Sequence, residues 1–410
     1  VGYACSTPLG HGLSSTWERA LAGESGIRHI SRFDPRDYAV NVAGEIPDYQ
    51  PLSYEFIDEK ELKFWNARFV PMTMVVSRAA LKDAGIVVGP TNRDEVGCLV
   101  GSALNGLDAY EEAVRGYQAG GPLKVSPMLL PNVCANLPAG KAAMLLGFRG
   151  PTYSPGAACA TGNFCIAEAS WLIQSGRVEV MLAGGVELPI LAPIICGFGN
   201  MNAAIKSRKD RSGDNPALAS RPYSRDRKGF VLSEGCGIVV LTSLEYARAH
   251  GLTPRAEVRG VGISSDAYHF TKPNRETITA AMRASIEDAG LSPADIQHVN
   301  GHGTSTMAGD ACEVACLREV FGRHLGRIPL TSNKSQLGHS LGATAAVEDI
   351  LAIESMRHGV ILPTINHDPD PALTDVDVVG NAPRRQAHEI VLSNAFGFGG
   401  TNCCLVLQGM

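Results

Sequence analysis

The sequence predicts an α/β fold made of two similar halves. Three apolar runs bounded by glycine, residues 96–100, 178–183 and 237–241, have the composition of strands buried on both faces. Helical patterns alternate with these runs and end near Gly85 and Gly176, where a left-handed residue commonly closes a helix. Strands that alternate with helices favour mostly parallel sheets covered by helices.

A second series of elements begins after residue 250. Its first helix follows Ser243, a good N-cap, and a later helix is expected to open at Asp310 with the form of a capping box. The expected elements are strands near 256–261 and 298–300 and helices over 244–250, 277–289 and 341–357. We therefore expect one half over residues 1–250 and the other over residues 251–410.

The composition narrows the classes of function. The chain has 410 residues, 45 % of them hydrophobic and 19 % charged, which excludes a disordered protein. A net charge of −5 gives no reason to expect nucleic-acid binding. No apolar stretch is long enough to span a bilayer, and no secretory leader precedes the eleven cysteines. These features predict a cytoplasmic protein with reduced thiols and no membrane partner.

Cys159 is the candidate nucleophile. It lies among small residues in Gly156-Ala-Ala-Cys159-Ala-Thr-Gly162, directly before a helical pattern. A helix start presents free N–H groups and partial positive charge, which favour a thiolate, and small neighbours leave room for a substrate carbonyl. A cysteine chosen at random is more often a core residue, and we assign Cys165 to packing.

Two loops carry a histidine among glycines: Asn300-Gly-His302-Gly and Leu337-Gly-His339-Ser. Such a histidine is poorly placed for core packing and well placed to face a cavity, although each alone fits a surface or structural histidine as well. A third glycine-rich loop, Phe396-Gly-Phe398-Gly-Gly-Thr-Asn402, has amides that could form an anion-binding nest. In isolation this loop also fits a hairpin turn.

Together, in this order and spacing, the four segments resemble the elongating β-ketoacyl-acyl-carrier-protein synthases, the condensing enzymes of dissociated fatty-acid synthesis. The likeness runs end to end, through Thr7-Pro-Leu-Gly10, Ser220-Arg-Pro-Tyr223 and Ser264-Ser-Asp-Ala-Tyr268. The resemblance implies the thiolase fold, with two similar halves in five layers (αβαβα). It also implies a homodimer and an acyl carrier protein as the partner that delivers acyl and malonyl thioesters.

The same resemblance implies a role for each matching residue. Cys159 would carry the acyl group, and His302 and His339 would contact the malonyl thioester. Lys334 would support the site, with Glu348 as its ion-pair partner. Phe398 matches a residue that gates the pocket, and the other supporting residues would be Phe396, Asn402, Thr271, Thr304 and Thr306. Leu104, Met128 and Phe198 fall where the family lines its acyl pocket.

The implied reaction is a decarboxylative Claisen condensation that lengthens an acyl chain by two carbons. A thiolate accepts the acyl group, and two histidines stabilise the enolate formed when malonyl loses carbon dioxide. No cofactor is expected, and none of the usual metal-ligand spacings occurs. Three places depart from the family pattern: Gly301 replaces an alanine, Met307 replaces a proline, and the segment Val186-Glu-Leu-Pro189 also differs.

Two basic clusters are candidates for docking the acidic carrier, with a solvated charged face as the alternative. They consist of Lys60, Lys63 and Arg68 on one helix, and Lys206, Arg208, Lys209 and Arg211 in a loop.

Other members of the condensing-enzyme class remain open. The chain could be the ketosynthase of a dissociated polyketide or polyene pathway, as a homodimer or with a chain-length-factor-like partner. A non-catalytic chain-length factor would lack Cys159. Initiating enzymes that use coenzyme A pair cysteine with histidine and asparagine, whereas His339 occupies the second polar position here.

Overall fold

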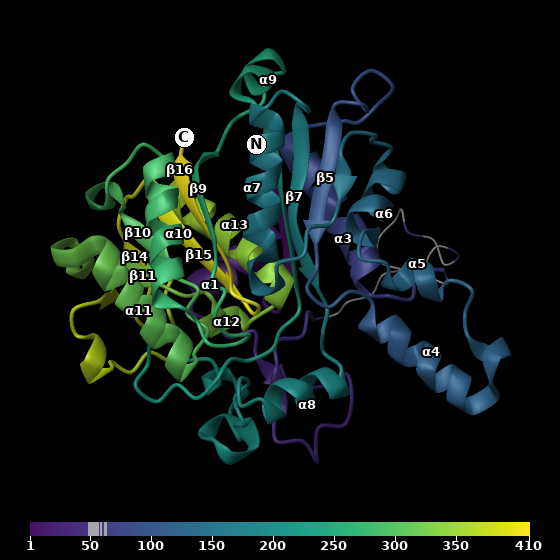
Figure 1. Cartoon of the computed structure of the whole chain (residues 1–410), viewed down its shortest axis with the longest axis horizontal. Coiled ribbons are helices and arrows are strands. Elements are labelled where there is room, and N and C mark those ends of the chain that lie inside the picture. Colours follow the sequence, from purple (N-terminus) through teal and green to yellow (C-terminus); the bar gives the residue numbers. More distant parts are fainter. Residues whose placement is uncertain (48–56, 58–59, 61–63) are drawn as a thin grey trace.

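Two mixed β-sheets form the framework of the computed structural model, which describes residues 1–47, Ile57, Lys60 and residues 64–410 (Figure 1). In spatial order, the first sheet contains β2 (Gly10–His11), β1 (Gly2–Thr7), β8 (Gly235–Thr242), β7 (Val180–Glu187), β5 (Val96–Gly101) and β6 (Thr152–Tyr153). The second contains β13 (Asp377–Val378), β11 (Pro329–Thr331), β10 (His298–Asn300), β15 (Ile390–Gly397), β16 (Thr401–Gly409) and β9 (Ala256–Ser265).

The two sheets repeat one topology. In the first sheet, β1 and β7 run antiparallel to β8, and β7, β5 and β6 are parallel. In the second, β9 and β15 run antiparallel to β16, and β15, β10 and β11 are parallel. The expectation of two similar halves is confirmed. The expectation of mostly parallel sheets holds for the second sheet, where three of five strand pairs are parallel, but not for the first, where three of five are antiparallel. In each half the first and last strands pair antiparallel.

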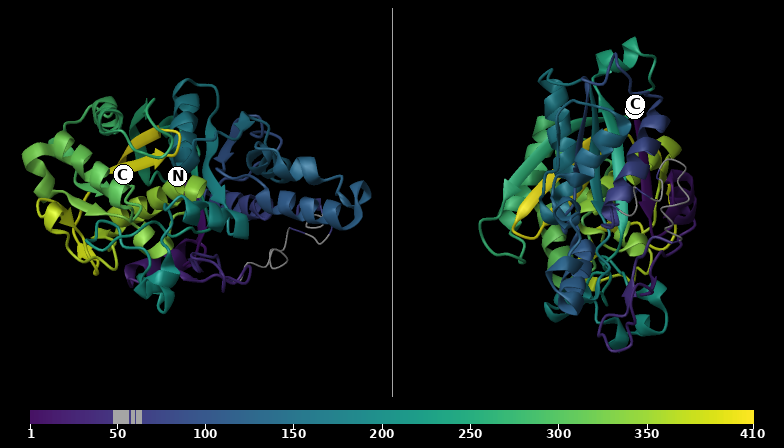
Figure 2. Two further views of the ribbon diagram at one scale, coloured as in Figure 1. Left: turned by 60° about the horizontal axis from the view of Figure 1, so that its bottom comes forward. Right: turned by 90° about the vertical axis from the view of Figure 1, so that its right-hand side faces the viewer.

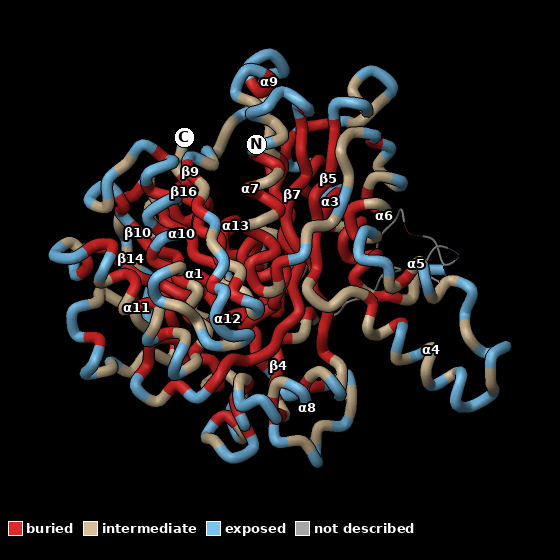
Figure 3. The backbone as a smooth tube through the Cα atoms, in the orientation of Figure 1, coloured by how far each residue is buried: buried red, intermediate tan, exposed pale blue. Residues whose placement is uncertain are grey.

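The layers alternate between helices and sheets. Helices α7 (Thr161–Gln174) and α13 (Thr344–His358) pack together between the two sheets. Helices α3 (Phe69–Ala84) and α6 (Leu137–Leu146) cover the outer face of the first sheet, while α10 (Arg275–Asp288) and α11 (Met307–Phe321) cover that of the second. The result is the five-layered αβαβα arrangement of the thiolase fold. Figure 3 shows buried chain running through both sheets and the central helices.

The remaining elements connect or border these layers. They are α1 (Leu13–Leu21), β3 (Arg28–His29), β4 (Val42–Ala43), α4 (Leu107–Gly120), α5 (Leu129–Val133), α8 (Ala192–Asn200), α9 (Leu244–Ala249), α12 (Lys334–Leu337), β12 (Val360–Ile361) and β14 (Arg384–Arg385). Helix α4 projects away from the two sheets (Figures 1 and 2). Within the described ranges, no helix combines the length and apolarity needed to cross a bilayer.

Two helix ends agree with the sequence prediction, and the start of α11 differs from it. Gly85 closes α3 in the left-handed conformation, and the Ser243 hydroxyl caps α9 by accepting from the N–H of Tyr246. Helix α11, expected to open at Asp310, begins three residues earlier because the Thr306 side chain accepts from the N–H of Gly309. Asp310 is therefore inside the helix, where its carboxylate accepts from the N–H of Tyr223.

Candidate active site

A cavity of about 670 Å³ brings residues of both halves together. Cys159 enters it from the first half, and His302, His339 and Phe398 enter it from the second. Pockets of this size commonly hold small molecules and cofactor arms. Cys159, His302 and His339, which were expected to share one site, therefore line one cavity.

A strained turn presents Cys159 at the start of α7. Ala158 has a φ of 47°, an uncommon value for a residue with a side chain, and the turn 158–160 leads directly into the helix. The Thr161 hydroxyl fixes the turn, since it accepts from the N–H of Ala157 and donates to the carbonyl of Ala158. The thiol is thus held at the mouth of a helix, as the sequence predicted.

The protonation of Cys159 differs from the expectation. Burial raises the pKa of the thiol to about 12, although the N–H of Phe398 and the charge of Lys334 both favour the thiolate. Because burial outweighs the helix start, the resting group is a thiol at neutral pH. Such a thiol becomes a nucleophile only after a nearby base accepts its proton.

His302 is held by its backbone. The N–H groups of His302 and Gly303 each donate to the Glu313 carboxylate at 2.8 Å. Its ring lies 5.5 Å from that of His339 (centroid to centroid), at an interplanar angle of 85°. Burial, followed by the charges of Lys334 and His339, lowers the pKa of His302 well below its usual value. The imidazole is therefore neutral at pH 7.

His339 is fixed by both backbone and side chain. Its N–H donates to Val231 at 2.7 Å, and its carbonyl accepts from Ser233 at 3.0 Å. Its Nδ1 lies 3.1 Å from the Thr344 hydroxyl, which can donate or accept and so supports either tautomer. Burial and then Lys334 lower the pKa of His339 well below its usual value.

Lys334 and Glu348 form the expected ion pair. The ammonium lies 2.7 and 2.8 Å from the two carboxylate oxygens, and the side chains are 1 % and 2 % exposed. Burial raises the pKa of Glu348 to about 7, against the effect of Lys334. The lysine charge favours neutral histidines and an ionised Cys159, so this pair influences all three reactive groups.

Phe398 lies beside the thiol on the turn between β15 and β16. Gly399 and Gly400 have φ values of 87° and 77°, so the turn needs residues without a side chain. The Phe398 ring contacts those of Phe198 and Phe270, with centroids 6.5 and 5.8 Å away. All three rings line the cavity, and Phe270 is exposed.

The other expected supporting residues also line the cavity. Phe396 packs its ring 5.3 Å from that of His302. Asn402 donates to Asp266 and Ser264, which ties the Phe398 turn to β9. The remaining cavity-lining threonines are Thr271, Thr304 and Thr306.

The expected acyl-pocket residues divide into two groups. Leu104 and Phe198 line the cavity. Met128 does not, since it caps α5 beside the projecting α4. Met128 therefore lies outside this cavity of the single chain, and its assignment to the acyl pocket stays a prediction.

The basic clusters need a similar correction. Lys206, Arg208, Lys209 and Arg211 are exposed on short turns, with Arg211 paired to Asp226 at 2.8 Å. Lys60 is exposed, and Lys63 lies outside the described residues. Arg68 is not on a helix with Lys60: it immediately precedes α3 and pairs at 2.7 Å with the buried Glu234. Its side chain is 20 % exposed, so it serves the interior more than the surface.

The sequence did not reveal two buried carboxylates that brace the cavity. Glu313, expected in a capping box, instead accepts from the backbone of His302 and Gly303 and from Tyr223. Glu187 accepts from Ser102, Ala103, Leu104 and Gly342. An acidic residue within an apolar strand or on the buried side of a helix was the available signal.

This arrangement of fold and site defines a condensing enzyme. Models of the beta-ketoacyl synthase N-terminal and C-terminal domains match residues 1–247 and 255–368. The chain belongs to the β-ketoacyl synthase family and is a condensing acyltransferase.

Relatives support this membership over the whole chain. The 3-oxoacyl-[acyl-carrier-protein] synthase 2 of Staphylococcus aureus is 37 % identical over 411 residues, covering 100 % of both chains. The protein of that name from Coxiella burnetii is 36 % identical over 410 residues, covering 100 % of this chain and 97 % of the relative.

Solved structures agree. The ishigamide ketosynthase/chain length factor has a TM-score of 0.91 and 31 % identity, and a beta-ketoacyl synthase from Burkholderia phymatum STM815 has 0.90 and 30 %. Each comparison covers 100 % of this chain and 98 % of the other.

Proposed function

We propose that this protein lengthens a carrier-bound acyl chain by two carbons, with Cys159, His302 and His339 as the reacting groups. The observation that carries the proposal is their convergence: a buried thiol from the first half and two neutral imidazoles from the second half line one cavity. Relatives named 3-oxoacyl-[acyl-carrier-protein] synthase 2 support the choice of carrier-bound substrates.

The first half-reaction moves the acyl group to Cys159. A neutral imidazole takes the thiol proton, the sulfur bonds to the thioester carbonyl carbon, and the bond to the carrier sulfur breaks. The departing carrier thiolate regains the proton from the imidazolium. The N–H groups of Cys159 and Phe398 are the proposed donors to the transient oxyanion, consistent with the bond from Phe398 to the resting sulfur.

The second half-reaction uses the malonyl thioester. The bond between its α-carbon and carboxylate breaks, carbon dioxide leaves, and the electron pair forms an enolate. His302 and His339, each protonated on Nε2, donate to the enolate oxygen. The α-carbon then attacks the Cys159 thioester, the C–S bond breaks, and the released thiolate takes a proton from solvent. Lys334 and Glu348 influence these groups through charge.

The direct test supplies purified protein with acyl-carrier and malonyl-carrier thioesters and follows the product by mass spectrometry. We expect a 3-oxoacyl-carrier product two carbons longer than the donor, with one carbon dioxide released per product. Acyl transfer to Cys159 without any carbon–carbon bond formation would refute the proposal.

A polyketide or polyene ketosynthase is the second candidate. It is favoured by the structural likeness to the ishigamide ketosynthase/chain length factor, at 31 % identity. Saturated donors and polyunsaturated donors of equal length distinguish the two candidates. Preference for saturated chains supports fatty-acid elongation, and preference for conjugated chains supports the second candidate.

The surface and assembly proposals rest on exposed residues. The turn bearing Lys206, Arg208, Lys209 and Arg211, together with Lys60, would receive the acidic carrier by charge complementarity. Lys63, outside the described residues, belongs to this proposal by its sequence position alone. A homodimer would cover the edge strand β6 and the exposed Met144 and Tyr153 nearby. Mass photometry tests the dimer, since a monomer alone would refute it.

Two further expectations are retained as proposals. We place the boundary between the halves near residue 250, consistent with sheet strands that lie before residue 243 in one half and after residue 255 in the other. We also propose a cytoplasmic location, which fractionation of the producing cells would test.

A further inference from the structure

Glu187 joins two segments of the cavity wall. It ends β7 and is 1 % exposed. From the loop after β5, its carboxylate accepts from the Ser102 hydroxyl at 2.9 Å and from the N–H groups of Ala103 and Leu104 at 2.7 and 3.1 Å. From the turn after His339, it accepts from the N–H of Gly342 at 3.2 Å. One side chain therefore receives four hydrogen bonds from two loops.

These two loops are in close contact. A Cβ on Gly342 would lie 2.8 Å from the nitrogen of Ala103 and 2.9 Å from a Glu187 oxygen. The turn therefore packs directly on the backbone beside Leu104. Leu341, in the same turn, lines the cavity with Leu104 and Cys159.

The repeated halves explain why this carboxylate has a turn to bind. In the first half, a turn with Ala158 at φ 47° precedes α7, which begins at Thr161. In the second half, a turn with Leu341 at φ 40° precedes α13, which begins at Thr344. Gly342 thus occupies the position of Cys159. The N–H of Gly342 is therefore the equivalent of the N–H of Cys159, and Glu187 accepts from it.

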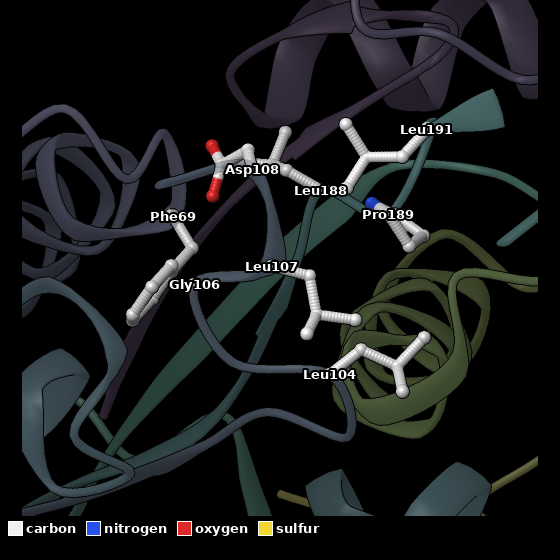
Figure 4. A pocket seen from close by; sticks show the side chains of 8 residues that line it. All are labelled: Phe69, Leu104, Gly106, Leu107, Asp108, Leu188, Pro189 and Leu191. Atoms are coloured by element: carbon white, nitrogen blue, oxygen red, sulfur yellow. The ribbon is translucent and has the colours of Figure 1, made fainter. Parts of the chain in front are cut away.

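Leu104 separates the cavity from a smaller space. The leucine lines the large cavity and also a hollow of about 10 Å³ (Figure 4). Figure 4 shows Leu107, Leu188 and Leu191 around the same hollow. Leu188 directly follows Glu187 in the chain. Glu187, which accepts from the N–H of Leu104, is therefore adjacent in the chain to a residue that lines the small hollow.

We propose that Glu187 is a positioning residue that holds Leu104 as a partition and so limits the length of the acyl chain that Cys159 accepts. This inference rests on the proposed function, because it assigns the apolar side of the cavity to the acyl chain. A carboxylate suits the position, since its oxygens only accept while all four partners can donate. Glutamine would direct an amide donor at backbone N–H groups and weaken the brace.

The experiment compares Glu187→Gln with the unaltered protein, using butanoyl-, octanoyl- and hexadecanoyl-carrier donors. With the brace weakened, the backbone that carries Leu104 is less constrained, so the leucine can yield to a longer chain. We expect kcat/KM for the longest donor, relative to the shortest, to rise about tenfold, as the loss of one charged hydrogen bond allows. Decarboxylation of malonyl-carrier is measured alongside, because Glu187 also accepts from Gly342 in the turn after His339. A change in that step affects every donor alike and leaves the ratio unaltered.

Two more variants make the test specific. Ser102→Ala removes only the hydroxyl donor to Glu187 and should shift the ratio in the same direction by a smaller factor; it decides the question if Glu187→Gln does not fold. Glu179→Gln, an exposed residue just before β7, should leave the ratio unchanged. An unchanged ratio in folded Glu187→Gln, or an equal loss with every donor, would overturn the inference. Absence of condensation by the unaltered protein would instead refute the proposed function.

Discussion

The hydroxyl of Tyr223 occupies the space that a side chain at residue 301 would need. A Cβ built on Gly301 would lie 2.1 Å from the tyrosine oxygen, far inside van der Waals contact. Tyr223 is fully buried, and its hydroxyl donates to Glu313 at 2.8 Å, the carboxylate that also binds the N–H of His302. The glycine that departs from the family pattern is thus paired with a tyrosine that helps hold the histidine loop.

We expect Gly301→Ala to destabilise the protein by about 1–3 kcal/mol through overpacking. Tyr223→Phe alone should cost about 1 kcal/mol for the lost hydrogen bond. The double variant should cost at least about 1 kcal/mol less than the sum, because phenylalanine vacates the required space. Urea unfolding of all four proteins measures the coupling, and strict additivity would show that the two positions do not compete.

Replacement of the nucleophile should abolish acyl-enzyme formation. We expect Cys159→Ala to show no mass increase with an acyl-carrier donor, because the sulfur that forms the thioester is gone. Cys165→Ala is the matched control, since that thiol is buried in α7 and does not line the cavity. Acylation of the Cys159→Ala protein at its normal rate would exclude this residue as the acyl carrier.

The histidine variants should separate the two half-reactions. His302→Ala and His339→Ala should each lower carbon dioxide release from malonyl-carrier by about 10²–10³-fold, the usual effect of removing one oxyanion donor. Each should retain some acylation of Cys159, because the other imidazole can still take the thiol proton. Intact-protein mass spectrometry and ¹⁴C-labelled carbon dioxide measure the two steps, and normal release from both variants would contradict the assigned roles.

The Lys334–Glu348 pair should control the acidic side of the pH profile. Lys334 lowers the pKa of both His302 and His339. Lys334→Met should raise these pKa values, so the imidazoles protonate at higher pH and acylation fails at higher pH. Glu348→Gln leaves the lysine charge unbalanced and should shift the acidic limb the opposite way.

Single-turnover acylation across pH measures this shift. Circular dichroism must accompany it, because breaking a buried ion pair costs about 3–5 kcal/mol. Shifts of equal sign in the two variants would rule out the electrostatic explanation.

Charge reversal should test carrier docking. We expect Lys206→Glu combined with Arg208→Glu to raise the KM for acyl-carrier at least about tenfold at low salt, with little change at high salt, where the unaltered protein also binds weakly. Turnover of a small acyl thioester without a carrier should not change. Arg211→Glu is a weaker test, because this arginine already pairs with Asp226. Equal KM values at low salt would remove this surface as the docking site.

The sequence alone predicted the architecture and the residues that meet in the cavity. Glycine-bounded apolar runs and capped helices are local signals, so the strands and helices that they predicted lie close to their observed positions. In this order and spacing, the Cys159, His302, His339 and Phe398 segments resemble those of the β-ketoacyl synthases, and that resemblance implied the reaction.

Only the tertiary structure decided how these groups are tuned and braced. Burial of Cys159 reverses the effect expected from a helix start, and burial depends on residues far away in the chain. The sequence predicted Arg68 to be a surface cation, whereas the structure pairs it with the buried Glu234. The sequence marked Glu187 and Glu313 only as acidic residues in apolar surroundings and did not predict their partners. Most of those partners are backbone N–H groups of distant loops, which no local sequence signal records because every residue except proline carries one.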